Sequence, residues 1–241
     1  MNKVFVTGDL HGSAIAAKYK ISQCKEANQD SFLIIAGDAG LEYGTRIMGS
    51  CKKILKNFPG KVIIMRGNHD NRYWQEHEND WEQQENLLFQ KKYDNIYYIK
   101  DAGGIYNIGG YDILFIPGAY SVDKFYRIKN NLPYNPNEQL THIEMNNLLD
   151  LIDIFKEVDF VVSHTAPLSL EPFFTDLFLN VVDQSTVDKN TEKFLDEVVS
   201  TLGISNFKHW FFGHYHDDRT IHNKFTMLYN NVVELGDYIG R

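Results

Sequence analysis

The segment VFVTGDLH (residues 4–11) decides the fold of the chain in our interpretation. It begins with a mostly apolar run typical of a buried strand, and Asp9 and His11 follow directly after Gly8. The same order, an apolar run and then residue types that bind metals, recurs in IAGD (35–38), RGNHD (66–70), VVSH (161–164) and FGHYH (212–216). Five of the nine histidines lie in these segments, which indicates a common site rather than chance scattering.

Strands and helices alternate over the first third of the chain. The pattern predicts strands over residues 4–7, 32–36 and 61–65, separated by helices over residues 14–28 and 47–57. Right-handed crossovers between such strands give a mainly parallel sheet with helices on its faces, so the pattern by itself favours one open sheet. Ligands of open α/β sheets bind beyond the carboxyl ends of the strands, where the metal-binding residue types stand.

Later segments continue the alternation less regularly. We expect strands over residues 96–99, 105–108, 111–116, 160–162, 210–212, 225–229 and 232–235, and helices over 138–155 and about 185–202. Residues 71–95 are expected to be helix and loop, and residues 117–137 form a connection long enough to be functional. Because no repeat or linker interrupts the chain, we predict one domain over residues 1–241.

Composition excludes several classes of protein. A net charge of −8 argues against a sequence-independent grip on nucleic acid, although a metal-lined cleft can still attract a phosphate. Cys24 and Cys51 are too few for a disulfide framework and lack zinc-site spacing. No apolar run reaches the length of a membrane span, so we expect a cytoplasmic protein without a membrane partner.

The clustered residues form a mixed oxygen and nitrogen ligand set. Such a set suits manganese, iron, zinc, cobalt or nickel better than calcium or magnesium, and manganese is the ion we expect. The candidate ligands are Asp9, His11, Asp38, Asn68, His164, His214 and His216. Since these are too many for one tetrahedral ion, we predict two divalent ions, roughly 3.5 to 4 Å apart, that clamp a phosphoryl group.

The succession D-x-H, G-D, G-N-H-D, H and G-H-x-H resembles the calcineurin-like metallophosphoesterase family over residues 4–216. The resemblance implies an α+β fold with four αββα layers, in which two facing sheets are flanked by helices. It further implies the role of each residue. Asp9, His11 and His216 would hold one metal, Asn68, His164 and His214 the other, Asp38 would bridge them, and His69 would be the general acid.

One motif departs from the family pattern. Many members carry G-D-x-x-D-R, in which the second aspartate supports the catalytic histidine and the arginine contacts phosphate, whereas this chain has Leu41 and Glu42 at those positions. A replacement cation is expected from Arg66, Lys124 or Arg127, which we list as candidate substrate-binding residues.

The expected activity is hydrolysis of a phosphate ester by a metal-bound hydroxide, with monoesters slightly favoured over diesters. A phosphorylated small molecule, a nucleotide and a phosphoprotein are all open as substrates. Two alternatives stand beside this reading. One is a metal-dependent nuclease or nucleotide phosphodiesterase, and the other is a non-catalytic scaffold of the same fold.

Overall fold

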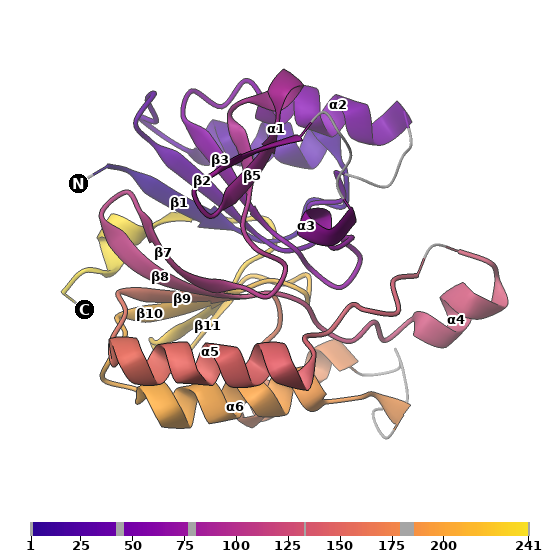
Figure 1. The fold of residues 1–241 in the computed structure, drawn as a ribbon, viewed down its shortest axis with the longest axis vertical. Coiled ribbons are helices and arrows are strands. Elements are labelled where there is room, and N and C mark those ends of the chain that lie inside the picture. The colour runs from indigo at the N-terminus through magenta and orange to yellow at the C-terminus, as the bar shows by residue number, and fades with distance from the viewer. Residues whose placement is uncertain (1, 42–45, 77–80, 133, 179–185, 241) are drawn as a thin grey trace.

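Two β-sheets face one another between two pairs of helices in the computed structural model, which describes residues 2–41, 46–76, 81–132, 134–178 and 186–240 (Figure 1). Helices α1 (Ala14–Gln23) and α2 (Arg46–Leu55) cover the outer face of one sheet. Helices α5 (His142–Phe155) and α6 (Asn190–Leu202) cover the other. The four αββα layers implied by the family resemblance are thereby confirmed, and the single open sheet favoured by the strand pattern is wrong.

The first sheet has seven strands with a parallel centre. Their order is β13 (Val232–Glu234), β1 (Val4–Thr7), β2 (Phe32–Ala36), β3 (Lys61–Met65), β6 (Ile96–Tyr98), β5 (Leu87–Gln90) and β4 (Trp81–Gln84). The pairs β1–β2, β2–β3 and β3–β6 are parallel, and the outer pairs are antiparallel. The parallel pairing brings the carboxyl ends of β1, β2 and β3 to one edge.

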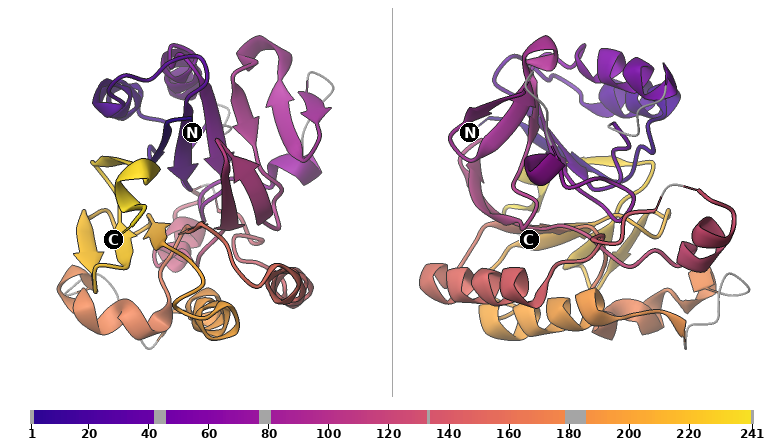
Figure 2. Two further views of the ribbon diagram at one scale, coloured as in Figure 1. Left: turned by 90° about the vertical axis from the view of Figure 1, so that its left-hand side faces the viewer. Right: turned by 45° about the vertical axis from the view of Figure 1, so that its right-hand side comes forward.

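The second sheet has six strands and also a parallel centre. Their order is β11 (Arg219–Ile221), β12 (Phe225–Met227), β10 (His209–Phe212), β9 (Phe160–Ser163), β8 (Tyr111–Ile116) and β7 (Gly104–Ile108). Strands β8, β9, β10 and β12 run parallel to one another. The two sheets lie face to face in both further views (Figure 2).

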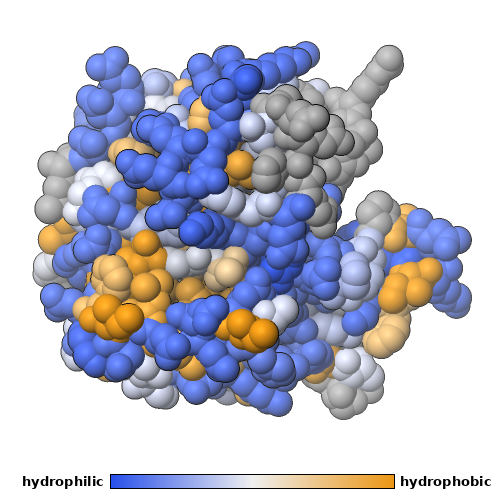
Figure 3. Space-filling view, viewed as in Figure 1, coloured by the Kyte–Doolittle hydropathy of each residue, from blue (hydrophilic) through white to orange (hydrophobic). Residues whose placement is uncertain are grey.

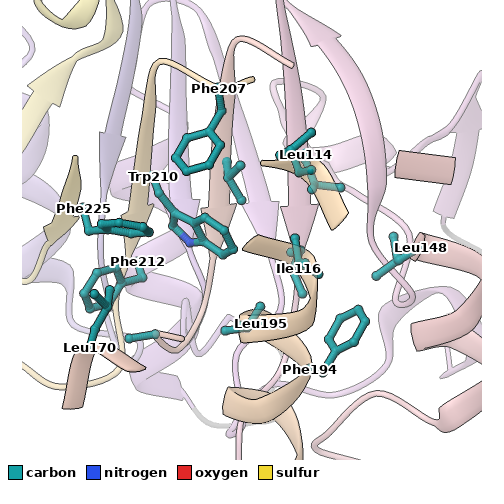
Figure 4. Packing of buried hydrophobic residues seen from close by; sticks show 14 of the residues in the cluster. Leu114, Ile116, Leu148, Leu170, Phe194, Leu195, Phe207, Trp210, Phe212 and Phe225 are labelled. Atoms are coloured by element: carbon teal, nitrogen blue, oxygen red, sulfur yellow. The ribbon is translucent and has the colours of Figure 1, made fainter. Parts of the chain in front are cut away.

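Every central strand is buried on both faces, because each sheet packs on the other sheet and on helices. In β2, Ile34 and Ala36 point into the cluster between the sheets, whereas Leu33 and Ile35 pack in the cluster beneath α1 and α2. On the far side, Trp210 and Phe212 of β10 pack with Phe194 and Leu195 of α6 (Figure 4). Strands buried in this way are continuous apolar runs rather than alternating ones.

Helix α5 begins four residues later than the sequence pattern predicts. Thr141 is its N-cap, and a reciprocal capping box joins the Thr141 side chain to the Glu144 backbone and the Glu144 side chain to the Thr141 backbone. Such a box satisfies backbone donors that the first turn leaves open. Glu138, which we had placed in the helix, instead lies buried in the connection before it.

The connection and the polar segment before it hold structure that the pattern did not predict. Residues 81–90 form the β4–β5 hairpin, and α4 (Lys124–Lys129) stands away from the body of the protein. Phe125, Tyr126 and Ile128 of α4 are exposed, and apolar side chains are visible on this projection (Figure 3). The remaining short elements are α3 (Tyr73–Glu76), η1 (Lys91–Tyr93), η2 (Leu168–Phe173), η3 (Thr175–Phe178) and η5 (Leu235–Tyr238).

Among the described residues, none of the helices combines the length and apolar character that crossing a membrane requires.

Candidate metal centre

The carboxyl ends of strands from both sheets meet at one place. His164, which follows β9, lies with its Nδ1 2.9 Å from the carbonyl oxygen of Ala36 at the end of β2. The backbone N–H of His214, after β10, donates to Asp9 Oδ1, after β1, at 3.1 Å. These contacts join the two sheets at the loops that carry the sequence motifs, so all seven predicted ligands are brought into one region.

Asp9, His11 and His216 form the first group. The Nε2 atoms of the two imidazoles face each other at 2.8 Å. Asp9 Oδ2 lies 3.1 Å from Nε2 of His216 and 3.6 Å from Nε2 of His11. This carboxylate oxygen is buried and accepts no hydrogen bond of good geometry from the described part of the chain. A buried acceptor facing two imidazole nitrogens fits a bound cation, which would satisfy all three atoms.

Asn68, His164 and His214 form the second group. Asn68 Oδ1 lies 2.8 Å from Nε2 of His164 and 3.1 Å from Nδ1 of His214. Asp38 lies between the groups, because its Oδ2 is 3.6 Å from Nε2 of His164 and 4.0 Å from Nδ1 of His11. Asp9 also approaches both groups, since Asp9, Asp38 and His164 have ligand atoms within 4.8 Å of one another.

Three glycines leave the space that these side chains occupy. A Cβ on Gly37 would lie 2.1 Å from Nδ1 of His164, and one on Gly67 would lie 2.1 Å from Oδ1 of Asp38. A Cβ on Gly213 would lie 2.4 Å from Oδ1 of Asp9. Close packing of the candidate ligands therefore requires glycine at these three positions. This requirement accounts for the order G-D, G-N-H and G-H in the sequence.

Four of the candidate ligands have left-handed backbone conformations. The φ angles are 47° for His11, 46° for Asp38, 70° for His214 and 55° for His216. Residues other than glycine adopt this region at a cost of about 1–2 kcal/mol each, and such strain gathers at functional sites. The surrounding hydrogen bonds hold the ligands in these conformations. The loops therefore keep an unfavourable backbone conformation that places the ligand side chains.

The two buried carboxylates dominate the electrostatics of the site. Burial acts to raise the pKa of Asp38, but the charge and hydrogen bond of His164 and the charge of His69 together outweigh burial, and the pKa is about 2. Burial acts to lower the pKa of His164, but the charge and hydrogen bond of Asp38 and the charge of Asp9 together raise the pKa to about 9. Burial and the nearby His164 lower the pKa of His214 to about 3. Positive charge beside the buried carboxylates therefore stabilises their ionised form, and a divalent cation supplies such a charge.

His69 borders this region without joining either group. Its backbone N–H donates to Asp38 Oδ1 at 2.9 Å, and its Nε2 is 3.9 Å from Asp38 Oδ2. The side chain is 19% exposed, so its ring reaches solvent. Burial and the charge of Arg127 lower its pKa, while the charges of Asp38 and Asp123 oppose this change.

The three basic residues predicted to bind substrate lie in different surroundings. Arg66 is 2% exposed, and its guanidinium donates to the carbonyl oxygens of Asp101 and Glu138. The contact of Arg66 with substrate stays a prediction, and its guanidinium is buried among backbone carbonyls. Lys124 and Arg127 lie on α4, and Arg127 is close enough to affect the pKa of His69. Leu41 is buried, and Glu42 lies outside the described residues.

Several buried polar residues that support the ligands were missed by the sequence analysis. Lys20 of α1 donates to the carbonyl oxygens of Gly8 and Asp9 at 2.9 and 2.6 Å. Asp70 accepts hydrogen bonds from the backbone of Gly40, Ala39 and Gly67, which ties the loops after β2 and β3 together. Asp70, the last residue of G-N-H-D, was the signal available in the sequence, whereas the burial of Lys20 is visible only in the structure.

A further buried carboxyl stands behind His164. Thr165 Oγ1 donates to Glu192 Oε1 at 3.1 Å and lies 2.8 Å from the hydroxyl of Tyr215, the residue between His214 and His216. Glu192 is 3% exposed, and its Oε2 has no hydrogen-bond partner among the residues that the structure describes. Burial raises the pKa of Glu192 from 4.5 to about 7.

This shift predicts a pH-dependent stability. Between pH 4.5 and about 7 the folded protein retains a proton on Glu192 that the unfolded chain releases, so the free energy of unfolding falls as pH rises. At about 1.4 kcal/mol per pKa unit, Glu192→Gln should raise the free energy of unfolding above pH 7 by up to about 3 kcal/mol. Denaturant unfolding at acidic and alkaline pH measures this, and an equal difference between variant and wild type at both would contradict it.

Comparison with known proteins gives a family match. A family model described as calcineurin-like phosphoesterase matches residues 2–218. No curated protein matches the chain. A protein of unknown function from Aquifex aeolicus has 12% identity and a TM-score of 0.45, with 98% of this chain and 97% of that chain covered. The phosphopantetheinyl hydrolase from Mycobacterium tuberculosis has 15% identity and a TM-score of 0.47, with 95% and 88% covered.

Proposed function

Because the chain belongs to the calcineurin-like phosphoesterase family, we propose that it hydrolyses phosphate esters with two divalent ions at the strand ends. The observation that carries this proposal is the pair of ligand groups with Asp38 between them. One group offers Asp9, His11 and His216, and the other offers Asn68, His164 and His214. Manganese is the proposed ion, since the mixed carboxylate, amide and imidazole set contains no thiolate.

The buried, unsatisfied oxygen of Asp9 and the glycine-lined space around Asp38 support the fit of metal ions. Two bound ions would lower the pKa of a water molecule between them and neutralise charge on the phosphoryl oxygens. The residues of this chain fix the positions of the ions. Asp38 lies between both groups, and His11, His214 and His216 are held in left-handed backbone conformations.

We assign His69 the role of general acid. Its backbone is held by Asp38, and its ring is partly open to solvent beside His11, with ring centroids 5.8 Å apart. An imidazole in this position can deliver a proton to the leaving oxygen of an ester whose phosphoryl group lies over Asp38. His69 thereby acts on the substrate, whereas the seven ligand residues act on the ions.

Asp123 and Arg127 are proposed to serve in place of the Asp–Arg pair that is missing at positions 41 and 42. Arg127 Nε donates to Asp123 Oδ2 at 2.6 Å, one helical turn apart. Both residues affect the pKa of His69, which supports a location on its side of the site. Arg127 would contact the phosphoryl oxygens, because a guanidinium binds phosphate with paired donors.

Arg127→Ala should raise KM for a phosphomonoester about 10-fold, since one charge-assisted hydrogen bond at a partly exposed site is lost. Lys124→Ala should have a smaller effect. The Lys124 ammonium lies 5.3 Å from the ring centroids of both Tyr120 and Tyr134, where it lines a separate cavity of about 500 Å³. Lys129→Ala on the same helix is the matched control. Equal KM values for wild type and Arg127→Ala would remove Arg127 from the substrate site.

A substrate panel tests the proposed reaction. Purified protein with manganese should hydrolyse p-nitrophenyl phosphate with a higher kcat/KM than bis(p-nitrophenyl) phosphate, because we propose a monoesterase. Faster cleavage of the bis-ester would make it a phosphodiesterase. Cleavage of DNA ahead of both would favour the nuclease alternative. No hydrolysis of any of these with manganese would favour the non-catalytic scaffold.

A further inference from the structure

The side-chain amide of Asn68 can serve a metal only in one of its two orientations. The amide oxygen is an acceptor and can face a cation, whereas the NH₂ group carries two donors and cannot. The two ends have nearly the same shape, so packing alone does not distinguish them, and the surrounding hydrogen bonds must do so. Hence the groups that surround the NH₂ end of Asn68 decide whether the second ligand group can form.

A buried serine receives this NH₂ group. Asn68 Nδ2 donates to Ser121 Oγ at 2.8 Å, across 53 positions of the chain. Both residues are almost fully buried, so water does not compete for the bond. With Nδ2 bound to Ser121, Asn68 Oδ1 points toward His164 and His214, at 2.8 and 3.1 Å from their ring nitrogens.

A buried glutamate fixes the serine in turn. The backbone N–H of Ser121 donates to Glu138 Oε1 at 3.1 Å. Burial raises the pKa of Glu138, and hydrogen bonds from the Ser121 side chain and backbone oppose this rise. The hydrogen bond to Glu138 fixes the backbone of Ser121, and the Ser121 hydroxyl accepts from the Asn68 NH₂ group through a lone pair.

We propose that Ser121 and Glu138 are positioning residues that hold the Asn68 amide with its oxygen toward the second metal. Glu138 accepts from the Ser121 backbone, and the Ser121 hydroxyl accepts from the Asn68 NH₂ group. This inference rests on the proposed two-metal function. Neither residue belongs to a sequence motif, because both come from the connection between β8 and α5.

We expect loss of the Ser121 hydroxyl to affect only one of the two ligand groups. Without the Ser121 hydroxyl, the buried NH₂ group of Asn68 loses its acceptor, and an unsatisfied buried donor is costly enough to favour rotation of the amide. Rotation would turn NH₂ toward the space between His164 and His214. Asn68 is not a member of the group formed by Asp9, His11 and His216, so that group should keep its affinity.

Manganese titration of the metal-free protein tests the proposal by calorimetry. For wild type we expect two binding steps, and Ser121→Ala should weaken one of them by about 10- to 100-fold, as loss of an orienting partner typically does. The other step should stay unchanged. Glu138→Gln, which keeps an acceptor oxygen, should weaken the same step to a smaller extent. Ser31→Ala removes a buried hydroxyl at the opposite end of β2 and is the matched control.

A second readout needs no metal. The Asn68 side-chain NH₂ protons should exchange with solvent more slowly in wild type than in Ser121→Ala, as measured by NMR. Two steps of unchanged affinity in Ser121→Ala, or equal weakening of both, would overturn the inference while leaving the proposed function intact. If Ser121→Ala does not fold, unchanged affinities in Glu138→Gln overturn it. Fewer than two binding steps in wild type would overturn the proposed function itself, and this inference with it.

Discussion

Replacing His69 with asparagine should lower kcat for an alkyl phosphate by about 10²- to 10⁴-fold, the usual contribution of a general acid. The imidazole borders Asp38 and reaches solvent, but it belongs to neither ligand group. Its loss should therefore remove proton delivery while the metal content of the protein stays the same. Steady-state kinetics and metal analysis on the same preparations measure both quantities.

The identity of the leaving group gives this prediction its control. p-Nitrophenolate is a stable anion that departs with little help from an acid, so His69→Asn should impair p-nitrophenyl phosphate hydrolysis less than alkyl phosphate hydrolysis. An equal loss on both substrates would contradict a general acid role. Loss of metal from the variant would instead indicate that His69 supports a ligand.

Replacing Asp38 with asparagine should lower kcat/KM by more than about 10²-fold, exceeding the typical effect of changing a residue that only supports a ligand. Asp38 lies between the groups, and His164 and His69 together hold its pKa near 2 against the effect of burial, so its charge is present at every working pH. Asparagine keeps the shape and can still accept from the His69 backbone. The loss therefore reports the charge of Asp38, which we propose serves both ions.

Metal content after desalting distinguishes this effect from misfolding. Asp38→Asn should retain less than one ion per chain at a manganese concentration that fills the wild type. Asp153→Asn is the control, because Asp153 makes an exposed ion pair with Lys156 on α5. Full metal content in Asp38→Asn, with activity near that of wild type, would remove Asp38 from the bridging position.

The sequence predicted β1, β2, β3, β6 and β13 of the first sheet but missed β4 and β5, and it could not assign the strands to layers. In β2, Leu33 and Ile34 face different layers, yet both are fully buried, so the apolar run carries no alternation that would reveal a facing sheet. Residues 160–163 and 209–212 are mostly apolar and equally buried, and they give no sign that they belong to a different sheet from β1. The two-sheet arrangement came from the family resemblance of the motifs.

The residues of the site likewise divide into those that the sequence could reveal and those that it could not. Asp9, Asp38 and His164 could be recognised because each follows a strand at a short, fixed spacing. Ser121 and Glu138 could not, since their value depends on contacts between distant parts of the chain. The position of Arg66 next to G-N-H-D suggested a place at the site surface, and nothing in the sequence indicated that its guanidinium donates to buried backbone carbonyls.

The most direct test of the two-metal account is manganese titration of the metal-free protein with p-nitrophenyl phosphate hydrolysis followed at each step. The account predicts two ions per chain at saturation and hydrolysis that rises with occupancy of the second site, because both ligand groups act on one phosphoryl group. Full activity with a single ion per chain, or in protein stripped of metal, would contradict it.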